Sequence, residues 1–312
     1  MFDHSSGFVT RCVRGNRMTS GPRGLWKQLM TSSTTKVQSP LLQQLRHGLE
    51  PEQFRNAWRD ILDGWHRREL WATLGLHDVR QRYRRSTLGP FWITISMGVM
   101  VFALGLLYGQ IFGQELHEYL PFLAAGFVIW GLLSEMILGG CTTFIAAEGM
   151  IRQLNAPVSI YAYREVWSAV IAFAHNIWIF FAVAWWYDVG LSWNVLWVLP
   201  AVLILLLNGF WMALFFGLLS ARFRDVPLII GSLVQVLFFM TPVIWRPEML
   251  PDRALFLQLN PFYHMVEILR APMLGHAPAF ENWFAVLLIA VFGWAITLFF
   301  YSAYRWRIAY WV

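Results

Sequence analysis

The stretch 91–113 contains no charged residue, and this feature limits more than any other what the chain can fold into. At about 1.5 Å of rise per residue, a helix of this length crosses a hydrocarbon core of roughly 30 Å. The segment before it, "VRQRYRRSTLGPFW", places Arg80, Arg82, Arg84 and Arg85 at the membrane edge. Positive charge beside a span stays on the cytoplasmic side. We therefore expect the chain to enter the membrane from the cytoplasm, with these arginines near the lipid headgroups.

Further apolar stretches repeat this pattern, and the composition agrees with it. The sequence is 57% hydrophobic and includes 25 Phe and 18 Trp, which leaves too little polar surface for a water-soluble protein of 312 residues. The predicted spans are 91–113, 119–146, 158–187, 193–220, 227–245 and 283–304. Six crossings return the chain to the cytoplasm. The expected fold class is therefore an all-α integral membrane protein of six transmembrane helices with both termini inside.

The charges of the connecting loops test this orientation. Loops placed inside carry arginines, namely Arg152, Arg164, Arg222, Arg224, Arg305 and Arg307. Short loops placed outside carry acids, namely Glu115, Glu118 and Asp188. The last outside loop is an exception and carries Arg246, Arg253 and Arg270. The pattern as a whole follows the rule that positive loops remain in the cytoplasm.

The chain before the first span divides into two parts. Residues 1–50 are rich in Gly, Ser, Thr and Arg and are expected to form a disordered basic cytoplasmic tail, without the apolar core of a cleavable signal. Residues 51–85 show apolar residues at helical spacing, which predicts an amphipathic helix on the membrane surface or a helix packed on a partner. Lys and Arg outnumber Asp and Glu before the first span. Membrane topology and anionic lipid headgroups account for this positive charge, so no nucleic acid is expected as a partner. The spans then occupy 86–312.

The sequence contains few candidate catalytic residues and none of the common catalytic or nucleotide-binding motifs considered next. It holds no GxxxxGK[ST] phosphate loop, no HExxH and no GxSxG, and the cysteines Cys12 and Cys141 offer neither a disulfide framework nor a metal-ligand spacing. Glu135 and His175 stand near the middle of their spans, where a lone charge is costly. They are expected to face the bundle and to share a hydrogen bond. That bond either only holds two spans together or lies on a transport path.

Two segments at the membrane edges carry short helices. Within 148–155, the residues Met150, Ile151 and Leu154 share one helical face, and Pro157 follows as a stop signal. This predicts a helix of about two turns across the cytoplasmic ends of the spans.

After the fifth span, Asn260 suits a helix N-cap, Pro261 suits the first turn, Glu267 and Arg270 form an i,i+3 pair, and Pro272 is expected to follow the helix end. The apolar parts of this outside loop are too short to span, so re-entrant or surface helices are expected there.

Four separated segments around these spans resemble a known family. They are "VRQRYRRSTLGPFW", "EGMIRQLNAPVSIYAYREVW", "ARFRDVPLIIGSLVQVLFFMTPVIW" and "LNPFYHMVEILRAPMLG". In this order they resemble the membrane subunit of ABC exporters for lipid-linked polysaccharides, most closely the O-antigen exporters of Gram-negative bacteria. The resemblance covers about 70–312. The N-terminal extension is longer than such permeases usually carry, and no function is assigned to it.

The resemblance implies partners and sites. Two copies of the permease form the channel in the bacterial inner membrane, and two copies of a separate ATPase subunit bind below it and hold ATP and Mg, so this chain itself needs no cofactor. A coupling helix would dock into the ATPase through Glu148, Gly149, Met150, Ile151, Arg152, Gln153 and Leu154. The segment 58–85 matches an interface helix. The loop 246–280 matches an external gate, with Asn260, Pro261, Tyr263, Glu267 and Arg270 as its candidates.

The implied substrate is a polyprenyl pyrophosphate-linked glycan. Its anionic headgroup suits arginines at the cytoplasmic rim, and its sugar rings suit aromatic side chains. Candidate channel-lining residues are Trp92, Phe102, Tyr108, Phe238 and Phe239, although aromatic residues of spans also face lipid. Two alternatives stay open: an exporter of capsule, teichoic acid or a drug, and a membrane glycan-transfer enzyme using the outside carboxylates Glu248, Asp252, Glu267 and Glu281.

Overall fold

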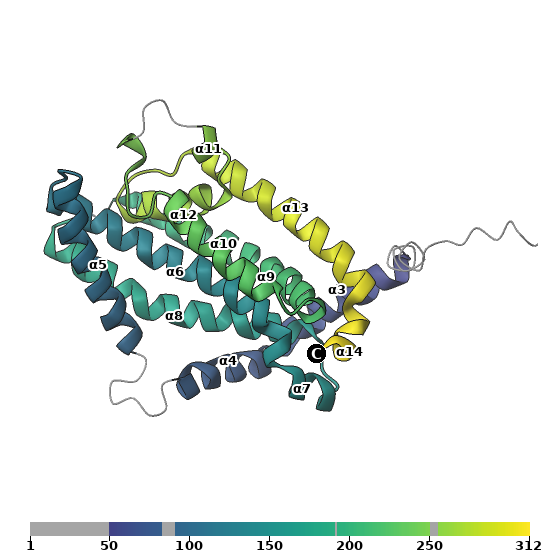
Figure 1. Ribbon diagram of the computed structural model, residues 1–312. Coiled ribbons are helices and arrows are strands. Elements are labelled where there is room, and N and C mark those ends of the chain that lie inside the picture. The colour runs from purple at the N-terminus through teal and green to yellow at the C-terminus, as the bar shows by residue number, and fades with distance from the viewer. Residues whose placement is uncertain (1–49, 83–90, 191, 250–254) are drawn as a thin grey trace, which may run out of the picture. The chain divides into compact units, whose positions relative to one another are not determined.

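The computed structural model describes residues 50–82, 91–190, 192–249 and 255–312, and the regular elements in these ranges are all helical (Figure 1). Nearly all of the predicted tail at 1–50, together with Arg84 and Arg85, lies outside the described residues. In chain order the elements are α3 (Pro51–His66), α4 (Arg68–Arg82), α5 (Phe91–Ile111), α6 (Leu116–Ala146), α7 (Glu148–Gln153), α8 (Ser159–Trp186), the 3-10 helix η1 (Trp193–Trp197), α9 (Val198–Arg222), α10 (Val226–Met240), η2 (Pro247–Met249), α11 (Leu255–Gln258), α12 (Pro261–Met273), α13 (Phe280–Tyr304), η3 (Arg305–Arg307) and α14 (Ile308–Trp311).

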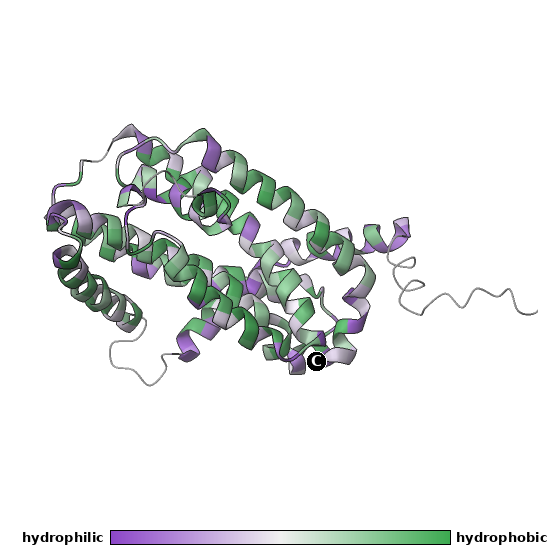
Figure 2. Ribbon diagram, turned by 45° about the horizontal axis from the view of Figure 1, so that its top comes forward, coloured by the Kyte–Doolittle hydropathy of each residue, from purple (hydrophilic) through white to green (hydrophobic). Residues whose placement is uncertain are grey.

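Five helices of the described residues are long and apolar enough to cross a membrane. Three of them are α5, α6 and α8. The fourth joins η1 to α9, and the fifth joins α13 to η3 and α14. Figure 2 shows hydrophobic residues along most of their length and hydrophilic residues gathered mainly near helix ends. These five match predicted spans to within a few residues.

The fifth predicted span, 227–245, is shorter in the structure than expected. The helix α10 has 15 residues, roughly 22 Å at 1.5 Å per residue, which is less than a hydrocarbon core of roughly 30 Å. It ends because Pro242 disfavours helical geometry in the residue before it, and Thr241 adopts extended angles (φ −91°, ψ 138°). The prediction that this helix continues to residue 245 was wrong.

The helix α6 forms the centre of the packed region. In its most apolar window, 67% of the residues are buried inside the chain, compared with 11% for α5. Glycines bring α6 and α9 close together: a Cβ atom on Gly140 would lie 2.9 Å from the Cα atom of Ala213, and one on Gly217 would lie 3.1 Å from the Gly140 carbonyl oxygen. Small residues permit such close helix packing in membranes.

The segment 51–85 was expected to be one amphipathic helix, and its described part, 51–82, forms two helices. Arg67 leaves helical geometry between them (φ −86°, ψ 39°), so α3 and α4 meet at an elbow. The buried face of α3 consists of Ala57, Asp60, Ile61 and Gly64. Its exposed large side chains are Phe54, Trp58, Leu62 and Trp65. The helix α3 packs on α8 and α13, whereas α4 packs on α8.

The caps predicted around α12 are present. The Asn260 side chain accepts a hydrogen bond from the Phe262 amide at 2.9 Å, and Pro261 begins the helix. The expectation that Pro272 follows the helix end was wrong, because α12 includes Pro272 and ends at Met273. A proline near the end removes only one hydrogen bond of the final turn, and Gly275, with φ of +87°, then turns the chain.

Candidate functional site

The short helix α7 lies between the end of α6 and the start of α8, where the sequence predicted one, and next to α14 (Figure 1). It has six residues and ends at Gln153, two residues before the predicted end, because Leu154 is extended (φ −103°, ψ 125°). Glu148 and Arg152 form an i,i+4 ion pair at 3.0 Å. Both side chains are substantially exposed, so this pair stabilises the helix by only a few tenths of a kcal/mol.

The three apolar residues of α7 and its end do not form one shared docking face. Met150 and Ile151 are partly buried and pack against a core cluster of this chain that includes Ile308 and Val312. Leu154 is 49% exposed. The prediction that all three await a partner was therefore wrong for Met150 and Ile151, which fix α7 to its own chain. The exposed surface, here named the α7 tip, consists of Gly149, Arg152, Gln153, Leu154 and Asn155.

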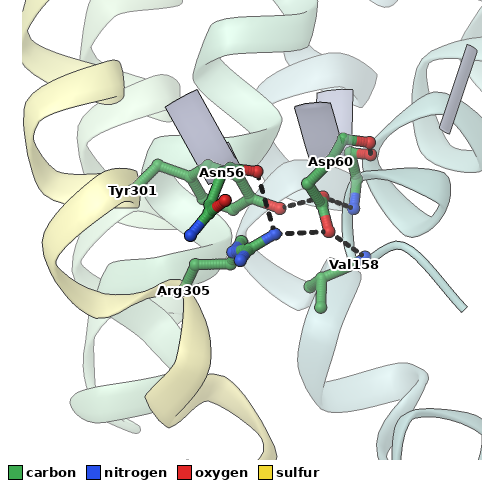
Figure 3. A network of polar contacts seen from close by, with 6 residues as sticks. Asn56, Asp60, Val158, Tyr301 and Arg305 are labelled. Atoms are coloured by element: carbon green, nitrogen blue, oxygen red, sulfur yellow. Dashed lines mark hydrogen bonds and ion pairs between the residues drawn. The ribbon is translucent and has the colours of Figure 1, made fainter. Parts of the chain in front are cut away.

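A buried carboxylate joins the chain around the base of α7. Asp60 of α3 is 8% exposed. Its oxygens accept hydrogen bonds from the amides of Val158 (3.2 Å) and Ser159 (3.0 Å), from the Tyr301 hydroxyl (2.6 Å) and from Nη1 of Arg305 (3.0 Å), as Figure 3 shows in part. We name these residues the Asp60 hub.

The Asp60 hub suits the start of α8. The Ser159 amide is one of the N-terminal amides that have no partner within their own helix, and a carboxylate at a helix N-terminus also interacts favourably with the helix dipole. The Ser159 hydroxyl in turn donates to the Asp60 carbonyl oxygen at 2.6 Å. Arg305 also donates to the Asn56 carbonyl oxygen at 3.1 Å. The hub thus binds α3, the start of α8 and the end of α13 together.

A second set of contacts fixes α4 against α8. Arg164 forms an ion pair with Asp78, and the Ser168 hydroxyl donates to the Gly75 carbonyl oxygen at 3.4 Å. A Cβ atom on Gly75 would lie 3.0 Å from the Arg164 carbonyl oxygen, so glycine is needed for this approach. The contacts of α3 and α4 are therefore both made with the N-terminal part of α8, the end that follows α7 in the chain.

Glu135 and His175 do not share the expected hydrogen bond. Oε1 of Glu135 pairs with Nη1 of Arg82 at 3.0 Å. The Nδ1 atom of His175 lies 2.7 Å from the Ile171 carbonyl oxygen of its own helix. Arg82, expected at the lipid headgroups, thus contacts α6 instead, whereas Arg80 is exposed on α4. The sequence analysis did not single out Glu165. Its carboxylate lies so close to Gly139 of α6 that a Cβ atom at that position would clash with it.

The proposed channel-lining residues divide into two groups. Trp92, Phe102 and Phe239 are 53%, 57% and 60% exposed on the described part of the chain. Tyr108 stacks on Phe112, and Phe238 contacts Phe127 and Trp130 within the core. Only the first group lies on an open surface of α5 and α10.

In the predicted external gate, Arg270 is buried and has several partners. Its side chain is 1% exposed, donates from Nε to Glu267 at 3.1 Å, and lies 4.0 Å from the ring centroid of Phe122 on α6. It also donates to the Pro242 carbonyl oxygen at 2.5 Å. Arg270 thus contacts its own helix α12, the helix α6 and the chain just after α10. It holds these parts of the predicted gate together. Tyr263 lies about two turns earlier in α12, with its ring against that of His264.

Two hubs escaped sequence reasoning, those of Asp60 and His264. The ring nitrogens of His264 lie 2.7 Å from the Asn282 side-chain oxygen and 2.7 Å from the Gln258 carbonyl oxygen. Asp60 binds Tyr301 across 241 positions of sequence, so no local pattern indicates the contact. Within the described ranges, no three His, Cys, Asp or Glu side chains form a group able to hold a metal ion.

Comparison with known proteins gives matches over most of the helices described above. A family model, "ABC-2 type transporter", matches residues 69–274, from α4 through α12. The "O-antigen export system permease protein RfbA" of Myxococcus xanthus is 25% identical over 236 residues, which cover 72% of this chain and 90% of that protein. Two proteins of the same name from Klebsiella pneumoniae are 21% and 20% identical over 200 residues, covering 64% of this chain and 77% of each.

Proposed function

The chain belongs to the ABC-2 type transporter family, and on this premise we propose that it is the permease subunit of an exporter for a polyprenyl pyrophosphate-linked O-antigen, driven by a separate ATPase. It is a multi-pass protein of the bacterial inner membrane. The observation that carries the proposal is the family match, which includes α7 and its exposed tip. The names of the relatives supply the cargo.

The ATPase contact is assigned to the α7 tip. Leu154 exposes an apolar side chain there, and Gln153 and Asn155 beside it are exposed as well. The tip continues into Val158 and Ser159, which the Asp60 hub ties to α3 and α13. A displacement of the tip therefore moves three helices together, as a rigid-body switch requires. ATP and Mg bind the partner, and this chain supplies no ATPase site.

A second copy of the chain is assigned to α5 and α10. These helices leave large apolar side chains uncovered, among them Val99 and Phe102 on α5 and Val236 and Phe239 on α10. Gln235 is also exposed, in the interior of α10. An amide is poorly accommodated by hydrocarbon, so this side chain favours contact with protein or with a water-filled path. The export path would then run between two copies.

We further propose the six-span topology with both termini in the cytoplasm. The arginines of the α7 tip, of the end of α9 and of η3 then share the cytoplasmic side, as the charge rule requires. In this arrangement α10 completes its crossing through the non-helical residues 241–245. Such backbone is tolerated at membrane depth where protein covers it, and Arg270 binds the Pro242 carbonyl oxygen there.

The ATPase contact is tested by changing Leu154→Asp. A charge in place of the one large apolar side chain of the α7 tip should abolish co-purification of the ATPase and substrate-stimulated ATP hydrolysis, while membrane insertion stays normal. Leu259→Asp is the matched control, because Leu259 is 72% exposed near the external helices. Unchanged ATP hydrolysis in the Leu154 variant would remove the α7 tip from the contact.

The cargo is tested in a strain that lacks this chain. The lipid-linked intermediate that accumulates in the inner membrane is isolated and its glycan identified. The proposal expects an O-antigen on a polyprenyl pyrophosphate, and restored export when the chain is returned. Accumulation of capsule or teichoic acid precursors would reassign the exporter, and a glycan left unjoined to its acceptor after normal export would favour the transfer enzyme.

A further inference from the structure

Two cavities meet at the elbow between α3 and α4. The larger one, here named the apolar groove, has a volume of about 810 Å³ and lies among α3, α4, α8, α9 and α13. Its walls are almost entirely apolar, with the aromatic side chains of Trp58, Trp65, Trp71, Trp167 and Trp294 among them. Ligand pockets in proteins commonly measure roughly 300–1,000 Å³. The apolar groove is therefore large enough for a hydrocarbon ligand.

The second cavity, here named the basic cavity, has a volume of about 480 Å³. It is lined by the residues of the elbow itself, namely Trp65, His66, Arg67, Arg68, Glu69 and Leu70. Trp65 therefore lines both cavities, and the two adjoin. Throughout the described ranges, neither Arg67 nor Arg68 has an acidic side chain as an ion-pair partner. Glu69 is the one acid of the cavity lining, against two arginines.

We propose that the elbow binds an anionic phospholipid of the cytoplasmic leaflet, with its acyl chains in the apolar groove and its phosphate at Arg67 and Arg68. Guanidinium groups form charge-assisted hydrogen bonds with phosphate. An anionic leaflet also attracts basic side chains at the membrane edge. The pairing of an apolar groove with an adjoining basic cavity matches the two ends of such a lipid.

The depth of the apolar groove agrees with one leaflet. On α8 the lining runs from Tyr163 to Val170, and on α9 from Phe210 to Leu203. Seven residues of helix span about 10 Å, which lies within the half-thickness of a hydrocarbon core of roughly 30 Å. The groove therefore accepts acyl chains that descend from the cytoplasmic headgroup level, and it does not cross the membrane.

A resident lipid fits these cavities better than the exported glycan does. No residue of α5 or α10, the helices assigned to the path between copies, lines either cavity. The apolar groove is instead lined by Ile61, which follows Asp60 in the chain, and by Tyr163. The Tyr163 hydroxyl donates a hydrogen bond to the Ile61 carbonyl oxygen at 3.2 Å, so the groove adjoins the Asp60 hub. A bound phospholipid would brace α3 and α4 against α8, so it should raise the thermal stability of the protein.

Native mass spectrometry and thermal unfolding of the full chain in detergent test this inference. Phosphatidylglycerol is titrated against phosphatidylcholine, polyprenyl phosphate and inorganic phosphate. We expect phosphatidylglycerol to bind about tenfold or more tightly than phosphatidylcholine and to raise the unfolding temperature. Equal binding of the two phospholipids would overturn the headgroup site. Tighter binding of polyprenyl phosphate would reassign the cavities to the cargo, and a full stabilisation by inorganic phosphate would overturn the acyl chain site.

Variants separate the two ends of the proposed site. Arg67→Gln with Arg68→Gln should weaken phosphatidylglycerol binding by about tenfold or more, while Arg55→Gln with Arg59→Gln removes the same charge from α3 and should leave it unchanged. Leu207→Trp should fill the apolar groove and weaken binding. Leu199→Trp is its control, because Leu199 is 68% exposed on the same helix and does not line the groove. Unchanged binding in both test variants would overturn the proposal.

Discussion

The helices α6 and α5 are both apolar and both long enough to cross a membrane, but the chain covers them very differently. In their most apolar windows, 67% of the residues of α6 are buried inside the chain and only 11% of those of α5. Around α6 lie close glycine contacts and the packed faces of α8 and α9. Around α5 and α10 lie exposed apolar side chains.

This difference separates a frame from an edge. The frame, which consists of α3, α6, α8, α9 and α13, is fixed by close packing and by the Asp60 hub. The edge, which consists of α5 and α10, has surface that nothing in the described residues covers. In a bilayer, apolar exposure alone does not drive association, because lipid is equally apolar. The exposed Gln235 is what distinguishes the edge from a surface made only for lipid.

Replacement of Asp60 should have the largest effect on the frame. Asp60→Ala leaves Arg305 and the Ser159 amide without their buried partner, and breaking a buried charge pair typically costs about 3–5 kcal/mol. We expect a large loss of folded protein in detergent, measured by thermal unfolding and size-exclusion chromatography. Asp60→Asn keeps the shape and one acceptor oxygen, so it should be milder. Wild-type stability of Asp60→Ala would show that the hub does not hold the frame.

A pair of glycine variants compares the frame with the edge directly. Gly140→Val should push α6 from α9, because the added Cβ atom would lie 2.9 Å from the Ala213 Cα atom, and overpacking of this kind costs about 1–3 kcal/mol. Gly231→Val in α10 meets no atom within 4 Å and should leave the fold of one chain intact. Thermal unfolding measures both. Equal destabilisation by the two variants would erase the distinction between frame and edge.

The Glu135 variants should have the smallest effect. The Arg82 and Glu135 side chains are 53% and 32% exposed, and exposed pairs contribute about 0–1 kcal/mol. Glu135→Gln keeps an acceptor for Arg82 and should leave stability and export near wild-type levels. Lost export with normal thermal stability and normal ATP hydrolysis would instead place Glu135 on the transport path.

The sequence predicted the elements whose cause is local. Long apolar runs located five long helices, and Asn260 with Pro261 located the start of α12. Pro242 was a local signal that was overlooked, and it shortens α10. The contacts of the site could not be found in this way. Asp60 meets Tyr301 across 241 positions, and Glu135 meets Arg82 across 53, so only the packing of distant helices brings these groups together.

The same limit explains the error at α7. Helical spacing places Met150, Ile151 and Leu154 on one face, but spacing does not reveal that α14 packs beneath the helix. Because Met150 and Ile151 join the core cluster of Ile308 and Val312, the surface left for a partner is smaller and more polar than the sequence indicates. Of the three residues, only Leu154 remains exposed.

Cross-linking between copies tests most directly whether the edge is the surface where two chains meet. Val99→Cys on α5 and Val236→Cys on α10 are combined in a chain whose Cys12 and Cys141 have been replaced. Val99 and Val236 are 64% and 55% exposed, and Val291 on α13, which is 66% exposed, provides Val291→Cys as the control. A thiol cross-linker is added to intact membranes and the size of the product is measured. The account predicts a cross-linked dimer from the α5 and α10 pair and none from α13. A dimer through α13, with none through α5 and α10, would contradict it.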